Sequence, residues 1–198
     1  MSLLPLFLDL HGKRVLVVGG GSVAQAKLAA LQPTGCRVRA VSLTFSPAFL
    51  RELEGFDNER QDRAFHPDDL DGVHLVISAT NDPGANRFIA AHARSQGLWV
   101  NAVDDAASCD ALFPSILRRG PFVAAISTEG AFAGLSRVVR EALEGLVPDA
   151  AVPEFEALVQ LRQQLKQTLP DPRQRAEYLR GILWQIQQDT LLPKASNQ

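Results

Sequence analysis

The feature that most constrains this fold is a run of three glycines, 19–21, between an apolar strand and a helix. Residues 15–18 are β-branched or apolar, and residues 22–32 carry apolar side chains at helical spacing. Residues 37–43 then alternate as a second strand. A strand, a glycine turn, a helix and a strand within about 30 residues predict a mononucleotide-binding unit of a parallel sheet.

The small residues of this turn each have a physical reason. Gly19 permits the tight turn out of the strand, Gly21 lets a pyrophosphate approach the backbone, and Ala24 lets the helix pack closely on the sheet. The amides that open the helix, at Ser22 and Val23, then face the phosphates at its positive end. The sequence therefore predicts a dinucleotide site, and the alternative is a glycine-rich turn that binds nothing.

The second strand does not end in the acidic residue that usually holds ribose hydroxyls. Ser42, Leu43 and Thr44 stand there, and no arginine follows to receive a 2′-phosphate. The residues themselves therefore leave NAD and NADP both open. Ser42 or Thr44 can hydrogen-bond a ribose hydroxyl, although ordinary polarity at a strand end explains them equally well. Thr80 and Asn81 follow a later strand at the ligand-binding edge, where turn formation explains them almost as well.

Further strands and helices alternate along the chain and predict a parallel, doubly wound sheet with right-handed crossovers. The expected strands are residues 74–78, 98–103 and 122–127, and the expected helices are residues 47–54, 86–95 and 135–147. Residues 154–188 are predicted to be helical, with a break at Pro170-Asp171-Pro172. His74 is expected to be a satisfied core residue, and Trp99 and Trp184 are expected to be packing residues.

Composition excludes several classes of protein. The chain has 198 residues, 46% of them apolar, and a formal charge of −2, which permits a core and argues against nucleic acid as the main partner. Cys36 and Cys109 form no disulfide framework, and the four histidines have no metal-ligand spacing, so no metal site is predicted. The apolar start is interrupted by Pro5 and Asp9, and no apolar run reaches about 18 residues. We therefore expect a cytoplasmic protein without a membrane segment.

The order and spacing of several motifs resemble the precorrin-2 dehydrogenase/sirohydrochlorin ferrochelatase family, which includes the N-terminal part of siroheme synthase. The resemblance runs nearly end to end, and its motifs are Leu4-Pro5-Leu6-Phe7, the turn Gly19 to Ala24, Ala79-Thr80-Asn81-Asp82 with Asn86, Asn101 to Ser115, and Leu161 to Lys166 with Asp171 and Arg175.

The resemblance implies a Rossmann domain at residues 1–113, a dimerisation segment at 114–148 and a helical domain at 149–198, joined in a homodimer. It also implies that NAD takes a hydride from precorrin-2, which gives sirohydrochlorin. Some members of the family additionally insert ferrous iron into that product. The alternatives are therefore a bifunctional enzyme and a sensor that only binds its ligands.

The family's catalytic aspartate falls on Asp104. A carboxylate at the carboxyl end of a strand, beside the cofactor, is well placed to take the proton that accompanies hydride transfer. The adjacent Asp105 can raise the pKa of one member of the pair, although we expect Asp105 to be structural. A role as a turn or helix-cap residue is the alternative for Asp104.

The segment at 127–133 departs from the family pattern. Ser127, Thr128 and Gly130 are retained, whereas Ala131-Phe132-Ala133 replaces the usual Thr-Ser-Pro. We predict that Ser127 and Thr128 contact the substrate. The substrate carries many carboxylates, and Arg137 is the predicted cationic partner, together with further candidates at Arg118, Arg119, Arg140, Arg162 and Lys166.

Overall fold

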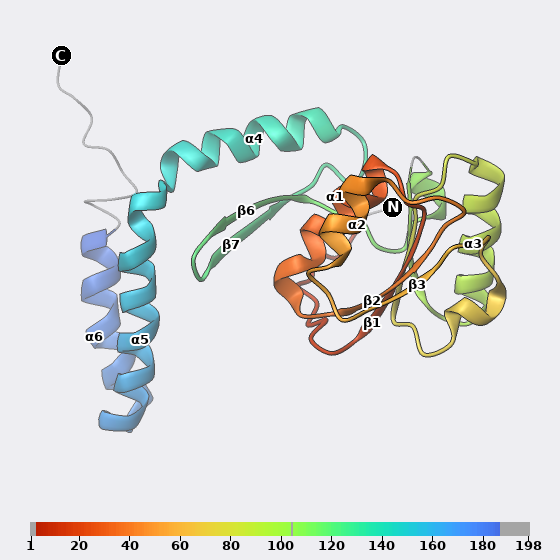
Figure 1. Ribbon diagram of the computed structural model, residues 1–198. Coiled ribbons are helices and arrows are strands. Elements are labelled where there is room, and N and C mark those ends of the chain that lie inside the picture. Colours follow the sequence, from red (N-terminus) through yellow and green to blue (C-terminus); the bar gives the residue numbers. More distant parts are fainter. Residues whose placement is uncertain (1–2, 104, 187–198) are drawn as a thin grey trace, which may run out of the picture. The chain divides into compact units, whose positions relative to one another are not determined.

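The computed structural model describes residues 3–103 and 105–186 (Figure 1). The chain divides into two compact units, Met1–Phe113 and Pro114–Gln198, which are described in turn. None of the helices formed by the described residues combines the length and apolar character needed to cross a lipid bilayer.

The first unit contains a five-stranded parallel sheet. Its strands follow the order β3-β2-β1-β4-β5 and are β1 (Arg14–Val18), β2 (Arg37–Val41), β3 (Asn58–Gln61), β4 (Leu75–Ser78) and β5 (Trp99–Ala102). The predicted parallel Rossmann-type sheet is therefore confirmed. The strand order reverses between β1 and β4, and ligands of open α/β sheets bind at such a point.

Helices cover both faces of this sheet (Figure 1). One face carries α1 (Ser22–Leu31) and α2 (Pro47–Leu53), and the other carries α3 (Pro83–Ser95). The apolar residues of β1 alternate between the two resulting cores, because Val15 and Val17 pack under α1 whereas Leu16 and Val18 pack under α3. Burial on both sides explains why this strand is continuously apolar.

The edge strand β3 has no apolar signal in the sequence, and the prediction misses it. All four of its side chains are exposed, so nothing selects alternating apolar residues. Its Glu59 carboxylate instead accepts hydrogen bonds from Arg14 at 3.1 Å and from Arg39 at 2.9 Å. These charges make β3 an edge that suits solvent rather than another strand.

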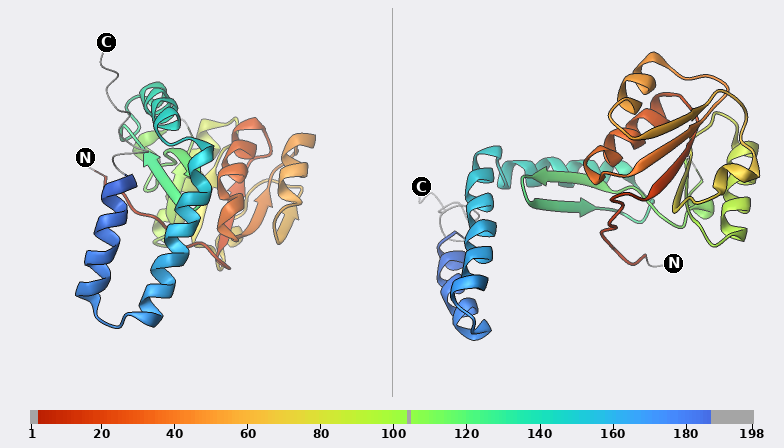
Figure 2. Two further views of the ribbon diagram at one scale, coloured as in Figure 1. Left: turned by 90° about the vertical axis from the view of Figure 1, so that its left-hand side faces the viewer. Right: turned by 60° about the horizontal axis from the view of Figure 1, so that its bottom comes forward.

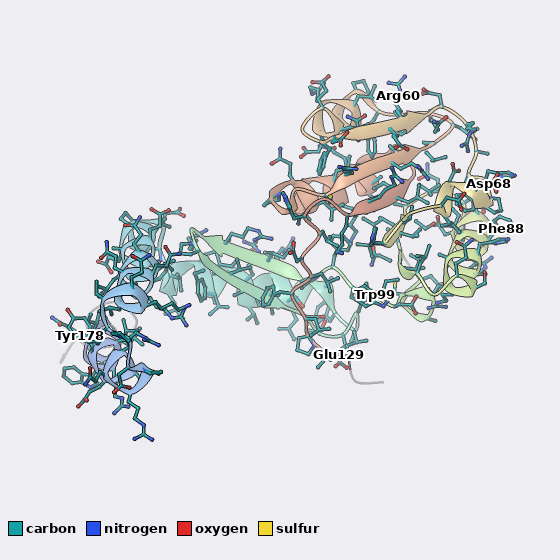
Figure 3. All side chains as sticks on the ribbon, turned by 90° about the horizontal axis from the view of Figure 1, so that it is seen from below. Arg60, Asp68, Phe88, Trp99, Glu129 and Tyr178 are labelled. Atoms are coloured by element: carbon teal, nitrogen blue, oxygen red, sulfur yellow. The ribbon has the colours of Figure 1, made fainter. Side chains whose placement is uncertain are left out.

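The prediction that His74 lies in the core is wrong, and the two tryptophans expected to be packing residues are largely exposed. His74 is exposed because it precedes the first residue of β4 at the amino end of the sheet. Trp99 begins the edge strand β5 and is 49% exposed, and it lies at the surface in Figure 3. Trp184 is 64% exposed.

The second unit contains a two-stranded hairpin and three long helices. Strand β6 (Ser115–Arg119), which the sequence analysis misses, pairs antiparallel with β7 (Phe122–Ile126), and α4 (Ala133–Leu146) packs along the pair. Helices α5 (Val152–Thr168) and α6 (Pro172–Ile186) run side by side and antiparallel, as Figure 2 shows. The break between them lies at the predicted proline pair.

Four short 3-10 turns complete the described chain: η1 (Gln32–Thr34), η2 (Pro67–Leu70), η3 (Ala106–Ser108) and η4 (Asp149–Ala151). In η2, the Asp69 carboxylate is buried. It accepts hydrogen bonds from the Arg63 guanidinium at 2.6 and 2.8 Å and from the His66 N–H at 2.8 Å. Burial favours the neutral acid, but the Arg63 and His66 bonds outweigh it and hold the pKa of Asp69 below its usual value.

A lowered pKa in the folded state means that this carboxylate stabilises the protein above about pH 4, its unfolded pKa. That stability is lost as the pH falls through the folded pKa. We expect Asp69→Asn to lower the free energy of unfolding at pH 7 by about 1–3 kcal/mol, because a buried charge-assisted pair is broken. In urea unfolding from pH 7 to pH 3, the gap between wild type and variant should shrink toward the acid end.

The matched control is Asp68→Asn, because the Asp68 side chain is 83% exposed and its partner is His66 (Figure 3). Its effect on the free energy of unfolding should stay below about 0.5 kcal/mol. A pH-independent gap for Asp69→Asn would contradict the assigned role of the ionised carboxylate.

Candidate functional site

The glycine turn leaves β1 between the loops that follow β2 and β4. The Gly19 N–H donates to the Val41 carbonyl at 2.9 Å, and the Ser46 N–H donates to the Gly20 carbonyl at 2.8 Å. Gly19 has a φ of 122°, and a Cβ on it would overlap the carbonyl oxygen of Ala79. A Cβ on Gly20 would overlap the carbonyl oxygen of Thr44. The first two glycines are thus required by the packing of the protein's own backbone.

Gly21 is different, because its missing side chain is not explained by any protein neighbour. It is the N-cap of α1, and a Cβ built on it meets no protein atom within 4 Å. No side chain caps this helix end. Open space above uncapped helix amides fits an anionic group such as a pyrophosphate.

The residues that follow Gly21 suit the same ligand. Ser22 and Val23 lie exposed at the start of α1, whereas Ala24 is fully buried against the sheet. A larger side chain than that of Ala24 would push the helix away from the strands and move its amides. The site residues present here therefore fit a dinucleotide.

The loop after β2 is closed by its own hydrogen bonds. The Ser42 hydroxyl donates to the Thr44 carbonyl at 2.7 Å, and the Thr44 N–H lies 3.4 Å from the same hydroxyl oxygen. Ser42 therefore shapes the turn that packs on Gly20, and its predicted contact with a ribose stays a prediction. Leu43 beside it is 75% exposed.

The loop after β4 is organised by one buried amide, that of Asn86 on α3. Its Oδ1 accepts from the hydroxyls of Ser78 at 2.7 Å and Thr80 at 2.8 Å, and from the Thr80 N–H at 3.1 Å. Its Nδ2 donates to the Thr80 carbonyl at 3.1 Å. Thr80 is thus held by Asn86. Asn81, the other cofactor-binding residue predicted in this loop, is exposed.

The sequence analysis names Asn86 only as part of a family motif and not as a site residue. The available signal is a polar residue on the buried face of α3, three residues before the buried Ile89. Its hydrogen bonds fix the strand-end loop against the helix, so it supports the site without having to touch a ligand.

The predicted catalytic residue, Asp104, lies outside the described residues. Its neighbour Asp105 accepts hydrogen bonds from the Ser108 hydroxyl at 2.7 Å and from the Ser108 N–H at 3.2 Å. The hydrogen bond from the Ser108 hydroxyl is the main cause that lowers the pKa of Asp105. Asp105 is therefore an ionised cap of η3, in agreement with a structural role, and its own pKa is lowered rather than raised.

The predicted substrate contacts belong to the second unit. In the loop between β7 and α4, which carries the labelled Glu129 in Figure 3, the Ser127 hydroxyl accepts from the Glu129 N–H at 3.0 Å. The Thr128 hydroxyl accepts from the Phe132 N–H at 2.8 Å. Both hydroxyls keep a proton to donate. The Phe132 ring, at the position that departs from the family pattern, is 64% exposed.

The arginine candidates differ in how firmly they are held. Arg137 is 71% exposed, and its Nε lies 3.8 Å from a Glu141 carboxylate oxygen, so its guanidinium remains accessible. Arg140 is paired with Glu144 and Glu141. Arg119 donates to the Val147 carbonyl at 3.1 Å and pairs with Asp149. Arg137 is therefore better suited to an anionic ligand than Arg119 or Arg140.

All eight predicted cofactor residues belong to the first unit, at or near the carboxyl edge of its sheet. They are Gly19, Gly21, Ser22, Val23, Ala24, Ser42, Thr80 and Asn81. Within the described ranges, no three His, Cys, Asp or Glu side chains gather in a way that could hold a metal ion.

Comparison with known proteins decides the family. A protein-family model described as "Putative NAD(P)-binding" matches residues 6–115, more than half of the chain. The chain belongs to this NAD(P)-binding family. The match covers the glycine turn, the loops after β2 and β4, and the segment after β5.

Curated relatives support the resemblance stated from the sequence, which is confirmed. The chain is 37% identical over 182 residues to a siroheme synthase of Pseudomonas entomophila, covering 92% of this chain and 39% of the relative. It is 44% identical over 157 residues to siroheme synthase 1 of Yersinia enterocolitica, covering 76% and 32%. The chain thus spans about two fifths or less of the length of these relatives.

A solved structure titled "SirC, precorrin-2 dehydrogenase" is similar over both units. The TM-score is 0.79 at 26% sequence identity, and the match covers 91% of this chain and 89% of that chain. The similarity therefore extends well beyond a dinucleotide-binding domain.

We expect Gly21→Asp to fold normally and to lose dinucleotide affinity. The new side chain meets no protein atom, but its carboxylate would occupy the space over the α1 amides and repel a pyrophosphate. The Kd for NAD, measured by isothermal titration calorimetry, should rise at least about 100-fold with an unchanged melting temperature.

The contrasting variant is Gly19→Ala, which should lower the melting temperature because its Cβ collides with the Ala79 carbonyl. Wild-type affinity for NAD in folded Gly21→Asp would remove the glycine turn from the cofactor site.

Proposed function

We propose that this chain is an NAD-dependent precorrin-2 dehydrogenase that converts precorrin-2 to sirohydrochlorin. The observation that carries the proposal is the similarity to the SirC precorrin-2 dehydrogenase, which covers 91% of this chain and therefore both units. The siroheme synthase relatives and the NAD(P)-binding family support the same chemistry. In the reaction, the substrate loses a hydride and a proton.

The cofactor part of the proposal rests on the first unit. NAD supplies the hydride acceptor when it is bound. The glycine turn and the amides of α1 bind its pyrophosphate, and Ala24 keeps those amides close to the sheet. Asn86 holds the loop after β4 in a fixed conformation beside them. A site preorganised through backbone groups needs little rearrangement on binding.

We assign to Asp104 the role of accepting the proton that the substrate loses. In the sequence Asp104 follows β5, whose carboxyl end lies on the same edge of the sheet as the glycine turn. Because Asp105 is occupied as the cap of η3, it is not available as the base. A carboxylate beside the cofactor can accept the proton released as the macrocycle is oxidised.

The substrate is a polycarboxylate, and the second unit offers groups that suit it. Ser127 and Thr128 retain hydroxyl protons to donate, and the exposed Arg137 guanidinium can pair with a carboxylate. The exposed Phe132 ring adds apolar surface in the same loop. These contacts are part of the proposal.

We further propose a cytoplasmic homodimer that uses the segment 114–148 as its interface, followed by a helical domain at 149–198. One face of α4 supports the interface, because apolar residues at helical spacing lie exposed along it: Leu135, Val138, Val139 and Leu146. Ser136 is the buried residue of this helix. The two free cysteines are consistent with a reducing compartment.

We expect Asp104→Ala to lower kcat at least about 100-fold, because general acid–base catalysis contributes that much or more. NAD affinity should remain within about twofold, since the pyrophosphate is held by the backbone. The assay follows NADH and macrocycle absorbance with purified protein, NAD and precorrin-2. Asp105→Asn is the matched control, because its amide oxygen can still accept from Ser108.

Normal turnover by Asp104→Ala would exclude it as the base. Wild-type protein that binds NAD without forming NADH would indicate a binding-only relative instead. Ferrous iron added after the first reaction tests the bifunctional alternative in the same cuvette.

We expect Val138→Asp to convert a dimer into a monomer, because it places a charge in the centre of the apolar face of α4. Light scattering coupled to size-exclusion chromatography measures the mass. The control is Val159→Asp on α5, a 43% exposed position outside the proposed interface, which should remain a dimer. A wild-type monomer at micromolar concentration would contradict the assembly.

A further inference from the structure

The segment that leaves β5 folds back onto the strand. The N–H groups of Asp110 and Ala111 both donate to the Val100 carbonyl, at 2.8 and 3.0 Å. Residues 103–111, which we name the β5 loop, therefore begin and end beside the same strand. Asp104 belongs to this loop in the sequence, and the described residues on either side of it show how the loop is fastened.

Cys109 contacts the backbone at both the end of β5 and the start of the β5 loop. Its Sγ lies 3.0 Å from the Ala102 carbonyl oxygen and 3.2 Å from the Ala102 nitrogen, so it pairs with both backbone groups of the last residue of β5. It also lies 3.4 Å from the Asp105 carbonyl. Burial raises the pKa of the Cys109 thiol, so the sulfur keeps the proton that the carbonyl contact requires.

Asn101 fastens the other side of the loop. Its side chain is buried, with 4% of the residue exposed, and its Nδ2 donates to the Ala111 carbonyl at 2.9 Å and lies 3.8 Å from the Cys109 sulfur. Its Oδ1 is buried and has no hydrogen-bond partner among the described residues. The amide cannot be reversed without placing this oxygen against the Ala111 carbonyl.

A buried amide with an unsatisfied oxygen is unfavourable for stability, so packing alone does not explain Asn101. What the residue does provide is a fixed distance between the strand and the returning end of the loop. Cys109 bonds to Ala102, and Asn101 bonds to Ala111. We name this pair of contacts the clasp, and it holds the chain before and after Asp104.

We propose that Cys109 and Asn101 are positioning residues, which fasten the β5 loop and thereby set the place from which Asp104 acts. The inference rests on the proposed function, in which Asp104 is the base. Displacing a catalytic group by about 1 Å can lower the rate about 100-fold. Neither side chain is assigned any contact with substrate or cofactor.

The test is a double-mutant cycle on the full chain, with the precorrin-2 assay as the readout. Cys109→Ala should lower kcat about 10-fold to 100-fold, with KM and the Kd for NAD within about twofold of wild type. Cys109→Ser should recover much of the rate, because a hydroxyl also donates and accepts. In an Asp104→Ala background, Cys109→Ala should cause no further loss, because it acts through the residue already removed.

The matched control is the other cysteine. Cys36 is 3% exposed in the core beneath α1 and α2, so Cys36→Ala should leave kcat unchanged even where it lowers the melting temperature. Equal losses from Cys109→Ala in both Asp104 backgrounds, or a loss confined to KM or to NAD affinity, would overturn the positioning role.

A second measurement separates this inference from the proposed function. Hydrogen exchange in the β5 loop should accelerate at least about 10-fold in Cys109→Ala, whether or not the wild type oxidises precorrin-2. Unchanged protection would overturn the clasp itself. Accelerated exchange in an inactive wild type would instead show that the clasp exists and that the proposed reaction is wrong.

Discussion

The site depends on the close approach of three backbone segments at the carboxyl end of β1. Gly19 lies against the Ala79 carbonyl and Gly20 against the Thr44 carbonyl, so the loops after β4 and β2 meet the glycine turn directly. Hydrogen bonds from Gly19 to Val41 and from Ser46 to Gly20 lock this arrangement. Any side chain at the first two glycines would separate the loops, and with them the groups on either side of a bound dinucleotide.

This arrangement also divides the work among the three glycines. The first two serve the protein's own packing, and the third leaves space above the uncapped end of α1. Affinity for a dinucleotide then comes mainly from backbone amides and the helix end, which do not distinguish NAD from NADP. The discrimination must come from the end of β2, where the Ser42 hydroxyl is already bonded to Thr44.

The sequence predicts the parts of the fold that local pattern controls. The β1–α1 turn, the parallel sheet and the two C-terminal helices follow from apolar periodicity, glycines and prolines. The sequence analysis misses strand β3 because its four side chains are all exposed and show no alternation of apolar and polar residues. It also misses β6, the first strand of the hairpin. Trp99 is misplaced because an edge strand exposes a residue that a central strand would bury.

The site is less accessible to sequence reasoning than the fold, because its supporting contacts are tertiary. Asn86 bonds to Ser78 and Thr80 across a turn, and its spacing resembles that of any polar residue on a helix. Cys109 is a lone cysteine in the sequence, and only folding brings it to the backbone of Ala102. Asp104 itself is indicated by family resemblance rather than by any local pattern.

These supporting residues share one physical property: each makes a hydrogen bond to the protein backbone, whatever side chains it also contacts. Asn86 binds Thr80, Cys109 binds Ala102, and Asn101 binds Ala111. A contact with the backbone fixes the path of a loop whatever side chains that loop carries. The sheet edge can therefore keep its geometry while the side chains on its loops change.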